Sequence, residues 1–380
     1  MFLFGGNMER LNGELGIIAM RGCEQFVGVV DAYLKQWRRH DDDIDFVMNA
    51  DCIRFGSGEG KAMLHDSARG HDIYIISDCF NYGVEYKMQG RMVPMSPDDH
   101  FADLKRVIAS IAGKATRISV IMPMLYEGRQ HKRTSRESLD CALALQELVS
   151  MGVSNIITFD AHDPRVQNAI PLSGFDNIRP TYQMLKALVR AVPDVKLDKD
   201  NVMFISPDEG AMGRSMYYAS ILGVELGMFY KRRNYSVVID GKNPIEAHEY
   251  LGKSVEGKDV IVVDDMISSG DSILDVSAQL KAKGARRVFL FVTFGLFVSG
   301  PEVFDRAYAE GLFDKVFTTN LTYTAPEILE RPWHESVNMC KYVAYIIDTL
   351  NHDSSISSLL DPVQRIHNLL EAQKEKNANN

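Results

Sequence analysis

The chain has 380 residues, of which 46% are hydrophobic and 24% are charged, which is typical of a globular protein of two, or about three, domains. Its net charge of −9 argues against a general affinity for nucleic acid or for a membrane surface. The five cysteines form no Cys-x-x-Cys pair, which argues against a disulfide framework and a thiolate zinc site. The N-terminus lacks the pattern of a signal peptide, and the longest apolar run, residues 288–298, is about half of a membrane-spanning length. We therefore expect a cytoplasmic protein that binds neither nucleic acid nor membrane.

Nearly continuous apolar runs predict six buried strands. They begin at Arg117 (RISVIMPML), Asn155 (NIITFDAH), Asn201 (NVMFISPD), Val224 (VELGMFYKRR), Asp259 (DVIVVDD) and Arg287 (RVFLFVTFG). Continuous runs of this kind are typical of a parallel sheet that is covered on both faces. Residues 135–152 and 270–285 predict helices, and Gly284 is a residue type that favours the end of the second one. Alternating strands and helices predict an α/β fold with right-handed crossovers.

Polar segments divide this alternating pattern roughly in half. Residues 160–180 and 190–200 are rich in Asp, Pro and Asn, and we predict that they form loops. The pattern predicts an N-terminal domain over residues 1–172, a C-terminal domain over residues 173–360 and a polar tail over residues 361–380. The last ten residues, EAQKEKNANN, lack apolar periodicity and are expected to fray.

Carboxylates and small residues gather where the strand starting at Asp259 ends. Asp264 and Asp265 close this strand, and the turn into the next helix consists of Ser268, Ser269, Gly270, Asp271 and Ser272. Ligands of open α/β sheets bind beyond the carboxyl ends of the strands. Backbone N–H groups at a helix start favour a phosphate, and paired carboxylates suit the hydroxyls of an attached sugar. The alternative is an aspartate-rich turn with a serine N-cap.

This strand, acidic pair and turn resemble the phosphoribosyl-diphosphate binding motif of type I phosphoribosyltransferase-like proteins. Further motifs match the ribose-phosphate diphosphokinase family, also called phosphoribosyl-diphosphate synthetases, from about residue 17 to about residue 360. In chain order they are RFGSGE (54–59), RQHKRTSRE (129–137), FDAH (159–162), SPDEG (206–210), YKRR (230–233), VSGP (298–301) and SSISSLL (354–360). The resemblance implies two tandem type I phosphoribosyltransferase-like domains, each a mostly parallel sheet flanked by helices.

The resemblance also implies an activity: transfer of the diphosphoryl group of Mg-ATP to O1 of ribose 5-phosphate. The products would be 5-phosphoribosyl 1-diphosphate and AMP. Lys231 and Arg233 match the catalytic pair of the family, which neutralises charge on the transferring group. The longer segment after them, residues 234–258, suits an irregular closing loop. The alternative for the pair is a solvated basic strand end.

Residues of two separate segments match the ATP site of the family. Arg129 and Gln130 correspond to residues that contact ATP, and an arginine can hold phosphate with two hydrogen bonds. Phe55 would lie against the adenine of a neighbouring subunit, with Ser57 and Glu59 in the same adenine loop. The alternatives are that Phe55 fills a core and that the basic run from residue 129 to residue 136 is a solvated loop.

The implied cofactor is Mg²⁺, and the implied assembly is a homo-oligomer. His162 matches a magnesium-associated histidine of the family, and Asp208 matches an oxygen ligand near the sugar. Magnesium prefers oxygen ligands and usually binds together with substrate phosphates, whereas a single histidine is more often structural. In the family, hexamers built from dimers are usual, and subunits share the adenine site.

The chain departs from the family pattern around adenine and around the regulatory region. His131 stands where the family has an aspartate, and one residue is missing ahead of Ser135 and Arg136, which match a regulatory phosphate region. Ser57 replaces an Asp or Asn, and Asp271 replaces a glycine. Residues 81–96, NYGVEYKMQGRMVPMS, form an extra segment.

These departures keep two other functions open. The turn at residues 268–272 is also similar to that of a phosphoribosyltransferase, which would consume the diphosphate with a base. The changes near Arg129 and at Ser57 would suit a non-catalytic regulatory subunit that binds an active homologue. Retention of Lys231 and Arg233 favours the synthetase over both.

Overall fold

The computed structural model describes residues 11–38, 45–233 and 245–378, which form two compact units. The first unit comprises Met1–Arg179, Leu321–Tyr323 and Asn338–Asp361, and the second comprises Pro180–Asn320, Thr324–Val337 and Pro362–Asn380. The chain therefore passes between the units several times. The domain limits at residues 172 and 360 stay a prediction. Among the described residues, no helix is both long and apolar enough to cross a membrane.

A five-stranded parallel sheet forms the centre of the first unit, with the strand order β1-β4-β7-β8-β9. Its strands are β1 (Glu14–Ala19), β4 (His71–Ile76), β7 (Arg117–Ile121), β8 (Asn155–Phe159) and β9 (Gly174–Ile178). The strands predicted from Arg117 and Asn155 are confirmed. The prediction of a loop over residues 160–180 is wrong, because this segment contains the 3₁₀ helix η1 (Pro164–Ala169) and the edge strand β9. Strand β9 is not predicted because it contains polar residues. One of them, Asp176, accepts a hydrogen bond from the Asn155 amide of β8 at 2.9 Å.

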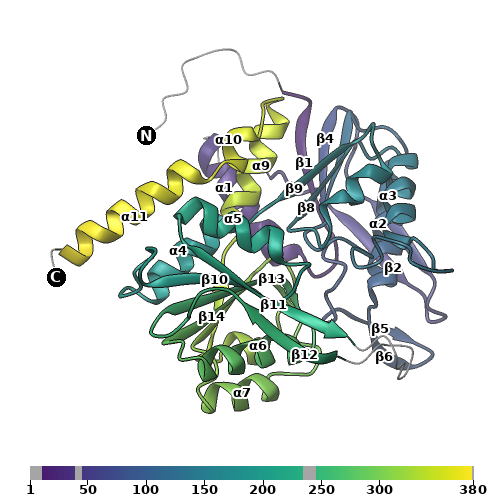
Figure 1. Cartoon of the computed structure of the whole chain (residues 1–380). Helices are drawn as coiled ribbons and strands as arrows, with labels where there is room; N and C mark the ends of the chain where they lie inside the picture. The colour runs from purple at the N-terminus through teal and green to yellow at the C-terminus, as the bar shows by residue number, and fades with distance from the viewer. Residues whose placement is uncertain (1–10, 39–44, 234–244, 379–380) are drawn as a thin grey trace. The chain divides into compact units, whose positions relative to one another are not determined.

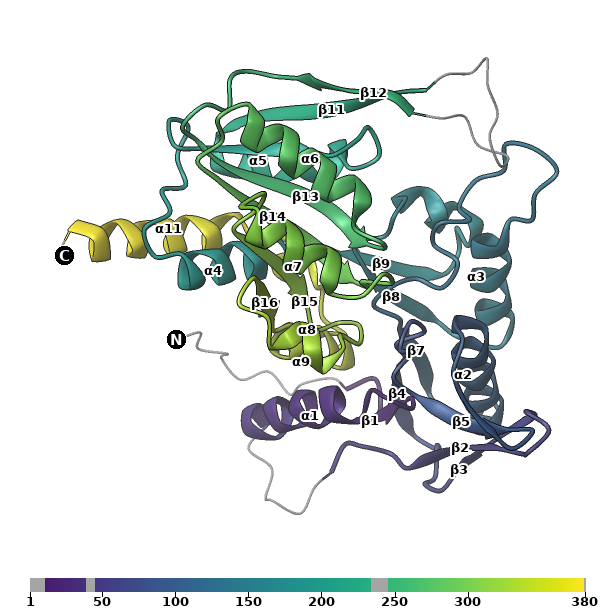
Figure 2. The same ribbon diagram turned by 90° about the horizontal axis from the view of Figure 1, so that it is seen from below.

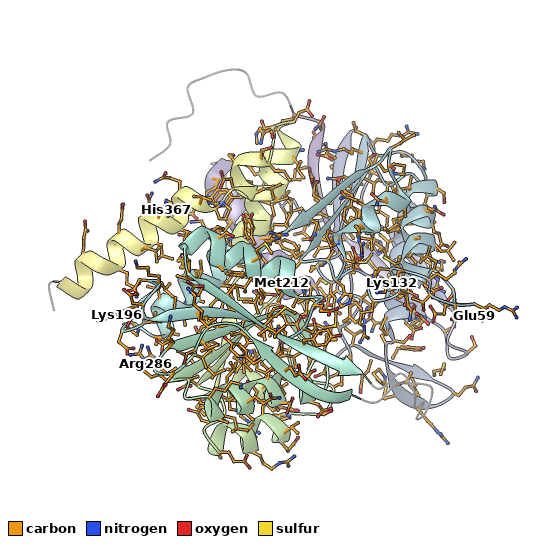
Figure 3. All side chains as sticks on the ribbon, in the orientation of Figure 1. Glu59, Lys132, Lys196, Met212, Arg286 and His367 are labelled. Atoms are coloured by element: carbon orange, nitrogen blue, oxygen red, sulfur yellow. The ribbon has the colours of Figure 1, made fainter. Side chains whose placement is uncertain are left out.

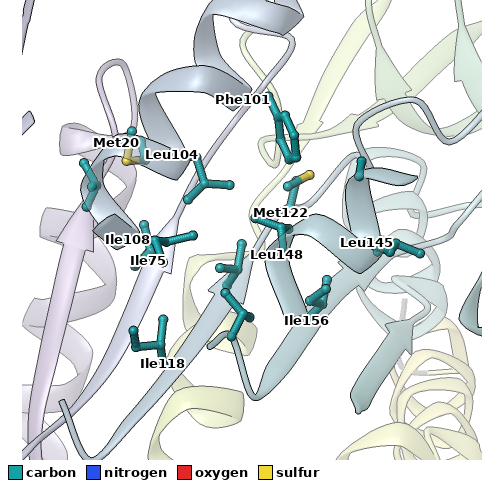
Figure 4. Close-up of a cluster of buried hydrophobic side chains, with 14 of the residues drawn as sticks. Met20, Ile75, Phe101, Leu104, Ile108, Ile118, Met122, Leu145, Leu148 and Ile156 are labelled. Atoms are coloured by element: carbon teal, nitrogen blue, oxygen red, sulfur yellow. The ribbon is translucent and has the colours of Figure 1, made fainter. Parts of the chain in front are cut away.

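Helices cover both faces of this sheet (Figure 2). They are α1 (Glu24–Arg38) on one face and, on the other, α2 (Pro97–Ile111) and α3 (Asp140–Ser150). Figure 4 shows side chains of α2 and α3, such as Leu104 and Leu148, packed on Ile75 and Ile156 of the strands. Two C-terminal helices complete the unit: α9 (Cys340–Asn351), which packs against α1, and α10 (Ser357–Leu360).

Two antiparallel hairpins belong to the same unit. The first consists of β2 (Ala50–Arg54) and β3 (Gly60–Leu64), and the second consists of β5 (Glu85–Met88) and β6 (Arg91–Pro94). The second hairpin is formed by the segment that the sequence comparison with the family marks as extra. It leads directly into α2, which begins with a capping box between Ser96 and Asp99.

The second unit contains a seven-stranded sheet with the order β12-β11-β10-β13-β14-β15-β16. Its strands are β10 (Val202–Ser206), β11 (Glu225–Arg233), β12 (Ile245–Leu251), β13 (Asp259–Ile267), β14 (Arg287–Gly295), β15 (Lys315–Thr319) and β16 (His334–Val337). All neighbours are parallel except β11 and β12. The four strands predicted here are confirmed. The irregular loop predicted after residue 233 is wrong in part, because β12 pairs with β11, while residues 234–244 lie outside the described residues.

Six helices are described in the second unit. They are α4 (Thr181–Ala191), α5 (Met212–Leu222), α6 (Asp271–Ala282), α7 (Glu302–Ala309), α8 (Pro326–Leu329) and α11 (Val363–Ala378). The helix end predicted near Gly284 is confirmed, since this glycine has a φ of 85° just after α6. The expectation that residues 371–380 fray is wrong for residues 371–378, which continue α11, a helix that packs against α4. Residues 379–380 lie outside the described residues. Ile366 of α11 is fully buried, and the Gln373 amide donates to the Val195 carbonyl at 2.7 Å.

A buried ion-pair network fixes the start of β13. The Asp259 carboxylate has no exposed surface and accepts hydrogen bonds from the guanidinium groups of Arg286 and Arg287 at 2.6–2.9 Å. Burial alone would raise the pKa of Asp259, but the hydrogen bonds from the two arginines keep it below its ordinary value. This network joins the beginning of β13 to that of β14, so the opposite end of β13 projects from a fixed base.

Candidate active site

The order of the strands reverses between β10 and β13. From β10 the chain passes through α5 to β11 on one side, and from β13 it passes through α6 to β14 on the other side. Figure 1 shows α5 on one face of this sheet and α6 and α7 on the other. Such a reversal leaves a crevice at the carboxyl ends of the two central strands, where open α/β sheets bind their ligands. Asp208 follows β10, and Asp264 and Asp265 lie near the end of β13, so both predicted segments meet here.

The acidic pair of β13 faces a buried arginine. Asp265 is 3% exposed, and its N–H donates to Oδ1 of Asp264 at 2.9 Å. Nη1 of Arg214, from the first turn of α5, lies 3.6 Å from Asp264 Oδ1 and 3.5 Å from Asp265 Oδ1. Burial raises the pKa of Asp264 well above its ordinary value, the Asp265 carboxylate raises it further, and Arg214 opposes both effects. Asp264 therefore holds its proton to a higher pH than an ordinary aspartate.

The sequence analysis did not single out Arg214. A signal was present, because a cation in the first turn of a helix opposes the helix dipole and needs a compensating partner. That partner is the acidic pair, which lies 50 residues further along the chain, so only the fold reveals it.

Asp208 lies in the turn ahead of α5 and contacts Ala211, the N-cap residue of this helix. Its Oδ1 accepts a hydrogen bond from the Ala211 N–H at 3.2 Å, and its carbonyl accepts one from the Ser206 hydroxyl at 2.6 Å. The next residue after Ala211 is Met212, the first of α5, which is labelled in Figure 3. The carboxylate of Asp208 also adds to the negative charge that Asp264 experiences. Oxygen donors of this kind fit Mg²⁺, which prefers them and keeps several waters.

The turn at residues 268–272 is built on a platform of aromatic side chains. Gly270 has a φ of 96°, and a Cβ at this position would lie 2.6 Å from the ring of Phe304. Phe304 is fully buried and contacts Phe297 and Trp333, with ring centroids 5.1 and 5.4 Å away. The Ser268 carbonyl accepts a hydrogen bond from the Val298 N–H at 3.0 Å. A side chain at position 270 would therefore be excluded both by backbone strain and by the platform.

Asp271 gives this turn a negative charge. It is exposed in the first turn of α6, and its Oδ2 accepts a hydrogen bond from the Ser269 hydroxyl at 2.9 Å. An acidic side chain at a helix N-terminus stabilises the helix but repels a phosphate bound at the same place. Ser272 is also exposed, and the turn contains three serines and an aspartate.

The predicted catalytic residues Lys231 and Arg233 lie in the last part of β11. In the antiparallel ladder, Lys231 is opposite His248 and Arg233 is opposite Ile245 of β12, with a register shift between Arg232 and Arg233. Of the segment predicted to close over the substrate, residues 245–251 form β12 and residues 234–244 lie outside the described residues. The catalytic role of Lys231 and Arg233 is not tested by this pairing and stays a prediction.

In the first unit, the predicted ATP residues Arg129 and Gln130 are exposed and border a hollow of about 640 Å³. The hollow is lined by Glu127, Arg129, Gln130, Lys132, Thr134, Arg136, Glu137, Ser138 and Asp140. Lys132 is labelled in Figure 3. Glu137 accepts hydrogen bonds from the Thr134 N–H at 3.2 Å and from the Ser135 hydroxyl at 3.1 Å, and these bonds lower its pKa. The basic run is therefore a loop with local order, and Arg136 shares the hollow with Arg129.

His162 lies just after β8, beside the unexpected histidine of the ATP motif. The rings of His131 and His162 are 5.3 Å apart, and Nε2 of His131 is 3.4 Å from Oδ2 of Asp163. Burial lowers the pKa of His131, although Asp163 acts to raise it. Hydrogen bonds from Arg165 lower the pKa of Asp163 to about 2. Within the described ranges, no group of three or more His, Cys, Asp or Glu residues is arranged to hold a metal ion.

The three predicted adenine residues lie together at the tip of the β2–β3 hairpin. Phe55 is 49% exposed, which excludes the alternative that it fills a core. The Ser57 hydroxyl donates to Oε2 of Glu59 at 2.8 Å. The loop is closed by the Phe55 N–H, which donates to the Glu59 carbonyl, and by the Gly58 N–H, which donates to the Phe55 carbonyl, both at 2.9 Å. Glu59 is labelled in Figure 3.

The first unit has a strand reversal of its own, but the chain itself occupies it. Val47 bridges to the outer side of β1, so the order reverses between β1 and β4. Asp78, just after β4, is 6% exposed and accepts hydrogen bonds from the N–H groups of Tyr323 at 2.7 Å and Phe80 at 3.0 Å. Burial raises the pKa of Asp78 to about 6. The strand-end carboxylate here binds the segment Leu321–Tyr323.

Fold and site together define a class: tandem α/β units of phosphoribosyltransferase type, the second with an acidic strand end and a small-residue turn. Comparison with protein families agrees with this class. The model for the N-terminal domain of ribose phosphate pyrophosphokinase matches residues 17–152, and the model for the phosphoribosyl transferase domain matches residues 176–325. The chain belongs to the ribose-phosphate pyrophosphokinase family.

Individual relatives cover most of the chain. A ribose-phosphate pyrophosphokinase of Parasynechococcus marenigrum is 27% identical over 313 residues, which is 81% of this chain and 85% of that protein. Ribose-phosphate pyrophosphokinase A of Dictyostelium discoideum is 25% identical over 320 residues, 84% of this chain and 92% of that protein. A phosphoribosylpyrophosphate synthetase structure from Mycobacterium smegmatis superposes with a TM-score of 0.72 at 21% identity, covering 90% of this chain and 100% of that one. The predicted fold is confirmed.

A side chain at position 270 is predicted to weaken the binding of a sugar phosphate. Gly270→Ala should push the turn away from Phe304 and lower the affinity for ribose 5-phosphate about tenfold or more, as measured by isothermal titration calorimetry. Gly213→Ala is the matched control, because a Cβ there, inside α5, has no neighbour within 4 Å. Equal affinities for the two variants would contradict the role of the turn.

Asp264→Asn is predicted to stabilise the protein at alkaline pH. A folded-state pKa above the unfolded value means that stability is full at low pH and declines as the pH rises through the raised pKa. Removing this charge should raise the midpoint of thermal unfolding by about 2 °C or more at pH 8, and the gain should vanish near pH 4.

The control for this variant is Asp275→Asn, on the exposed side of α6. Differential scanning calorimetry at both pH values provides the measurement. A lower midpoint for Asp264→Asn at pH 8 would show that the carboxylate stabilises the strand end instead of straining it.

Proposed function

We propose that this protein transfers the diphosphoryl group of ATP to O1 of ribose 5-phosphate, which releases AMP and forms 5-phosphoribosyl 1-diphosphate. The observation that carries the proposal is the tandem match of the two family domains, with the acidic pair and the small-residue turn at the strand reversal of the second one. The activity for which these relatives are named supports the same proposal.

Ribose 5-phosphate binds at the strand reversal of the second unit. Asp264 and Asp265 accept hydrogen bonds from the vicinal hydroxyls of the sugar, and Arg214 balances part of their charge. The N–H groups of residues 268–272 and the hydroxyls of the turn hold the 5-phosphate. The aromatic platform under Gly270 keeps this turn fixed, so little ordering is needed when the sugar phosphate binds.

ATP binds through residues of the first unit. Arg129 and Gln130 contact the nucleotide, and the arginine supplies paired donors to phosphate. Phe55 stacks on the adenine of a neighbouring subunit, while Ser57 and Glu59 contact the polar edge of the base. The 49% exposure of Phe55 supports this role, because an exposed aromatic ring is free to contact a partner. The assembly that follows is a homo-oligomer, a hexamer of dimers by family resemblance.

Mg²⁺ is the proposed cofactor. The oxygen donor of Asp208 fits this ion, and His162 is the second protein residue proposed to associate with it. When bound with the nucleotide, Mg²⁺ would neutralise phosphate charge. The fit rests on the donor chemistry of Asp208 and on the neighbouring acidic pair, which together form a negative site.

Catalysis depends on position and charge rather than on a covalent intermediate. The hydroxyl at O1 attacks the β-phosphorus of ATP and loses its proton, which is released to solvent. The bond from that phosphorus to the α-phosphate oxygen breaks, and AMP leaves with that oxygen. Lys231 and Arg233 neutralise the charge on the transferring group. The paired strands β11 and β12 support the closing segment after Arg233, which is proposed to exclude water during the transfer.

Phosphorus NMR of the protein with Mg-ATP and ribose 5-phosphate tests this activity. The wild type should produce AMP and a phosphoribosyl diphosphate signal, and Lys231→Ala should lower the rate by about 10³-fold or more. Lys253→Ala is the control, because this lysine is exposed and forms an ion pair with Glu225 at 2.6 Å. Absence of AMP from the folded wild type would refute the proposal.

The same samples separate the alternatives. Release of diphosphate when phosphoribosyl diphosphate and a purine or pyrimidine base are added would identify a phosphoribosyltransferase. An inactive chain that co-purifies with a second synthetase and raises its activity would identify a regulatory subunit.

Asp271 is predicted to weaken the binding of ribose 5-phosphate by charge repulsion. Asp271→Asn keeps the shape of the turn and an acceptor for Ser269, and it should lower KM for ribose 5-phosphate by about three- to tenfold at low salt. The difference should shrink at high salt because repulsion is screened. Steady-state kinetics measure KM for ribose 5-phosphate, and Asp275→Asn, one turn further along α6, is the control variant. A higher KM for Asp271→Asn would show that the carboxylate assists binding.

A further inference from the structure

The β5–β6 hairpin lies against the loop that carries Phe55, Ser57 and Glu59, which we call the adenine loop (residues 55–59). The Gln89 N–H at the hairpin tip donates to the Gly56 carbonyl at 2.9 Å. Two residues further along the loop, a Cβ at Gly58 would lie 2.8 Å from Sδ of Met88. The hairpin therefore contacts the backbone of the adenine loop at two positions.

The hairpin tip has a defined shape. Gln89 and Gly90 both have positive φ, 49° and 81°, and they join Met88 to its ladder partner Arg91. Two consecutive residues of positive φ form the tight turn that suits a two-residue hairpin. A non-glycine residue rarely adopts this conformation, so the surrounding contacts must hold Gln89 in place.

A buried arginine connects the base of the hairpin to the same loop. Arg54, whose side chain is 5% exposed, donates to the Gly58 carbonyl at 3.2 Å, and its guanidinium lies 4.9 Å from the centre of the Tyr86 ring. It also pairs with Asp99 at 3.2 Å and with Asp103 at 3.0 Å, both on α2. Tyr86 of β5 thus covers the cation that fixes the C-terminal half of the adenine loop.

Together these contacts restrain a loop that would otherwise be mobile. The adenine loop contains two glycines, Gly56 and Gly58, and glycine loses the most backbone freedom when a segment is ordered. The hairpin and Arg54 hold both glycines in the free protein. A loop that is already ordered binds its ligand more tightly, because less entropy is lost on binding.

We propose that the β5–β6 hairpin is a positioning element for the nucleotide base, with Met88 and Tyr86 as its positioning residues. It presets the adenine loop so that Phe55 and Glu59 present one face to the purine of a nucleoside triphosphate. This inference rests on the proposed function for its ligand, but the restraint on the loop is independent of any turnover.

Two methionines of this hairpin provide a matched test. Met88 lies on Gly58, whereas Met92, on the paired strand, is 59% exposed. Met88→Ala and Met92→Ala remove the same atoms from the same hairpin. In hydrogen exchange measured by mass spectrometry on the full chain, Met88→Ala should accelerate exchange of the peptide that spans residues 54–60 by about fivefold or more, and Met92→Ala should not.

Kinetics of the same variants link the restraint to the nucleotide. For Met88→Ala, KM for ATP should rise by about three- to tenfold while KM for ribose 5-phosphate stays within about twofold of the wild type. Unchanged exchange in residues 54–60 would overturn the proposal whether or not the wild type is active. Faster exchange with an unchanged KM for ATP would also overturn it, because the restrained loop would then not serve the nucleotide.

Discussion

The crowding of negative charge at the end of β13 is the constraint on which the site of the second unit depends. Asp264 and Asp265 are adjacent, Asp208 adds a third carboxylate, and Arg214 is the cation that contacts the pair. Such an arrangement costs free energy when the carboxylates ionise, so it persists only where the surrounding fold is firm. At the other end of β13, Asp259 fixes the strand by accepting hydrogen bonds from two arginines in a buried network. Stability elsewhere in the sheet thus allows carboxylates to crowd at this end, where we propose that the sugar binds.

The two units use the same topology differently. Both reverse their strand order, and both place a buried aspartate close to the end of a central strand. In the second unit, the carboxylates face the crevice with Arg214, whereas in the first unit Asp78 is occupied by N–H groups of Phe80 and Tyr323. The first unit instead presents its candidate nucleotide residues on loops, at residues 55–59 and 129–136. Loops tolerate change more readily than strand ends. These loops are also where the chain departs most from the family pattern.

The sequence predicts those parts of the structure that depend on local patterns. Long apolar runs locate β7, β8, β10, β11, β13 and β14, but the shorter buried strands β1, β4 and β15 are not predicted. The order of motifs locates Asp264, the 268–272 turn and the adenine loop. The edge strands β9 and β12 escape prediction because one polar face of an edge strand dilutes the apolar signal. Arg214 and Met88 escape it because their roles arise from contacts with residues distant in sequence. The residues of the proposed sugar site are therefore largely predictable from sequence, whereas the contacts that support the adenine loop are not.

The path of the chain between the two units has a consequence for the order in which they are made. The first unit begins at the N-terminus, yet it needs α9, whose Asn351 donates to the Gly13 carbonyl at 3.2 Å and to the Asp72 carboxylate at 3.0 Å. Helix α9, with Asn351, leaves the ribosome only after the whole seven-stranded sheet has been synthesised. The N-terminal unit emerges first, but its surface that packs against α9 stays uncovered until α9 has been synthesised. This unit is therefore more prone to misfold during synthesis than the second unit.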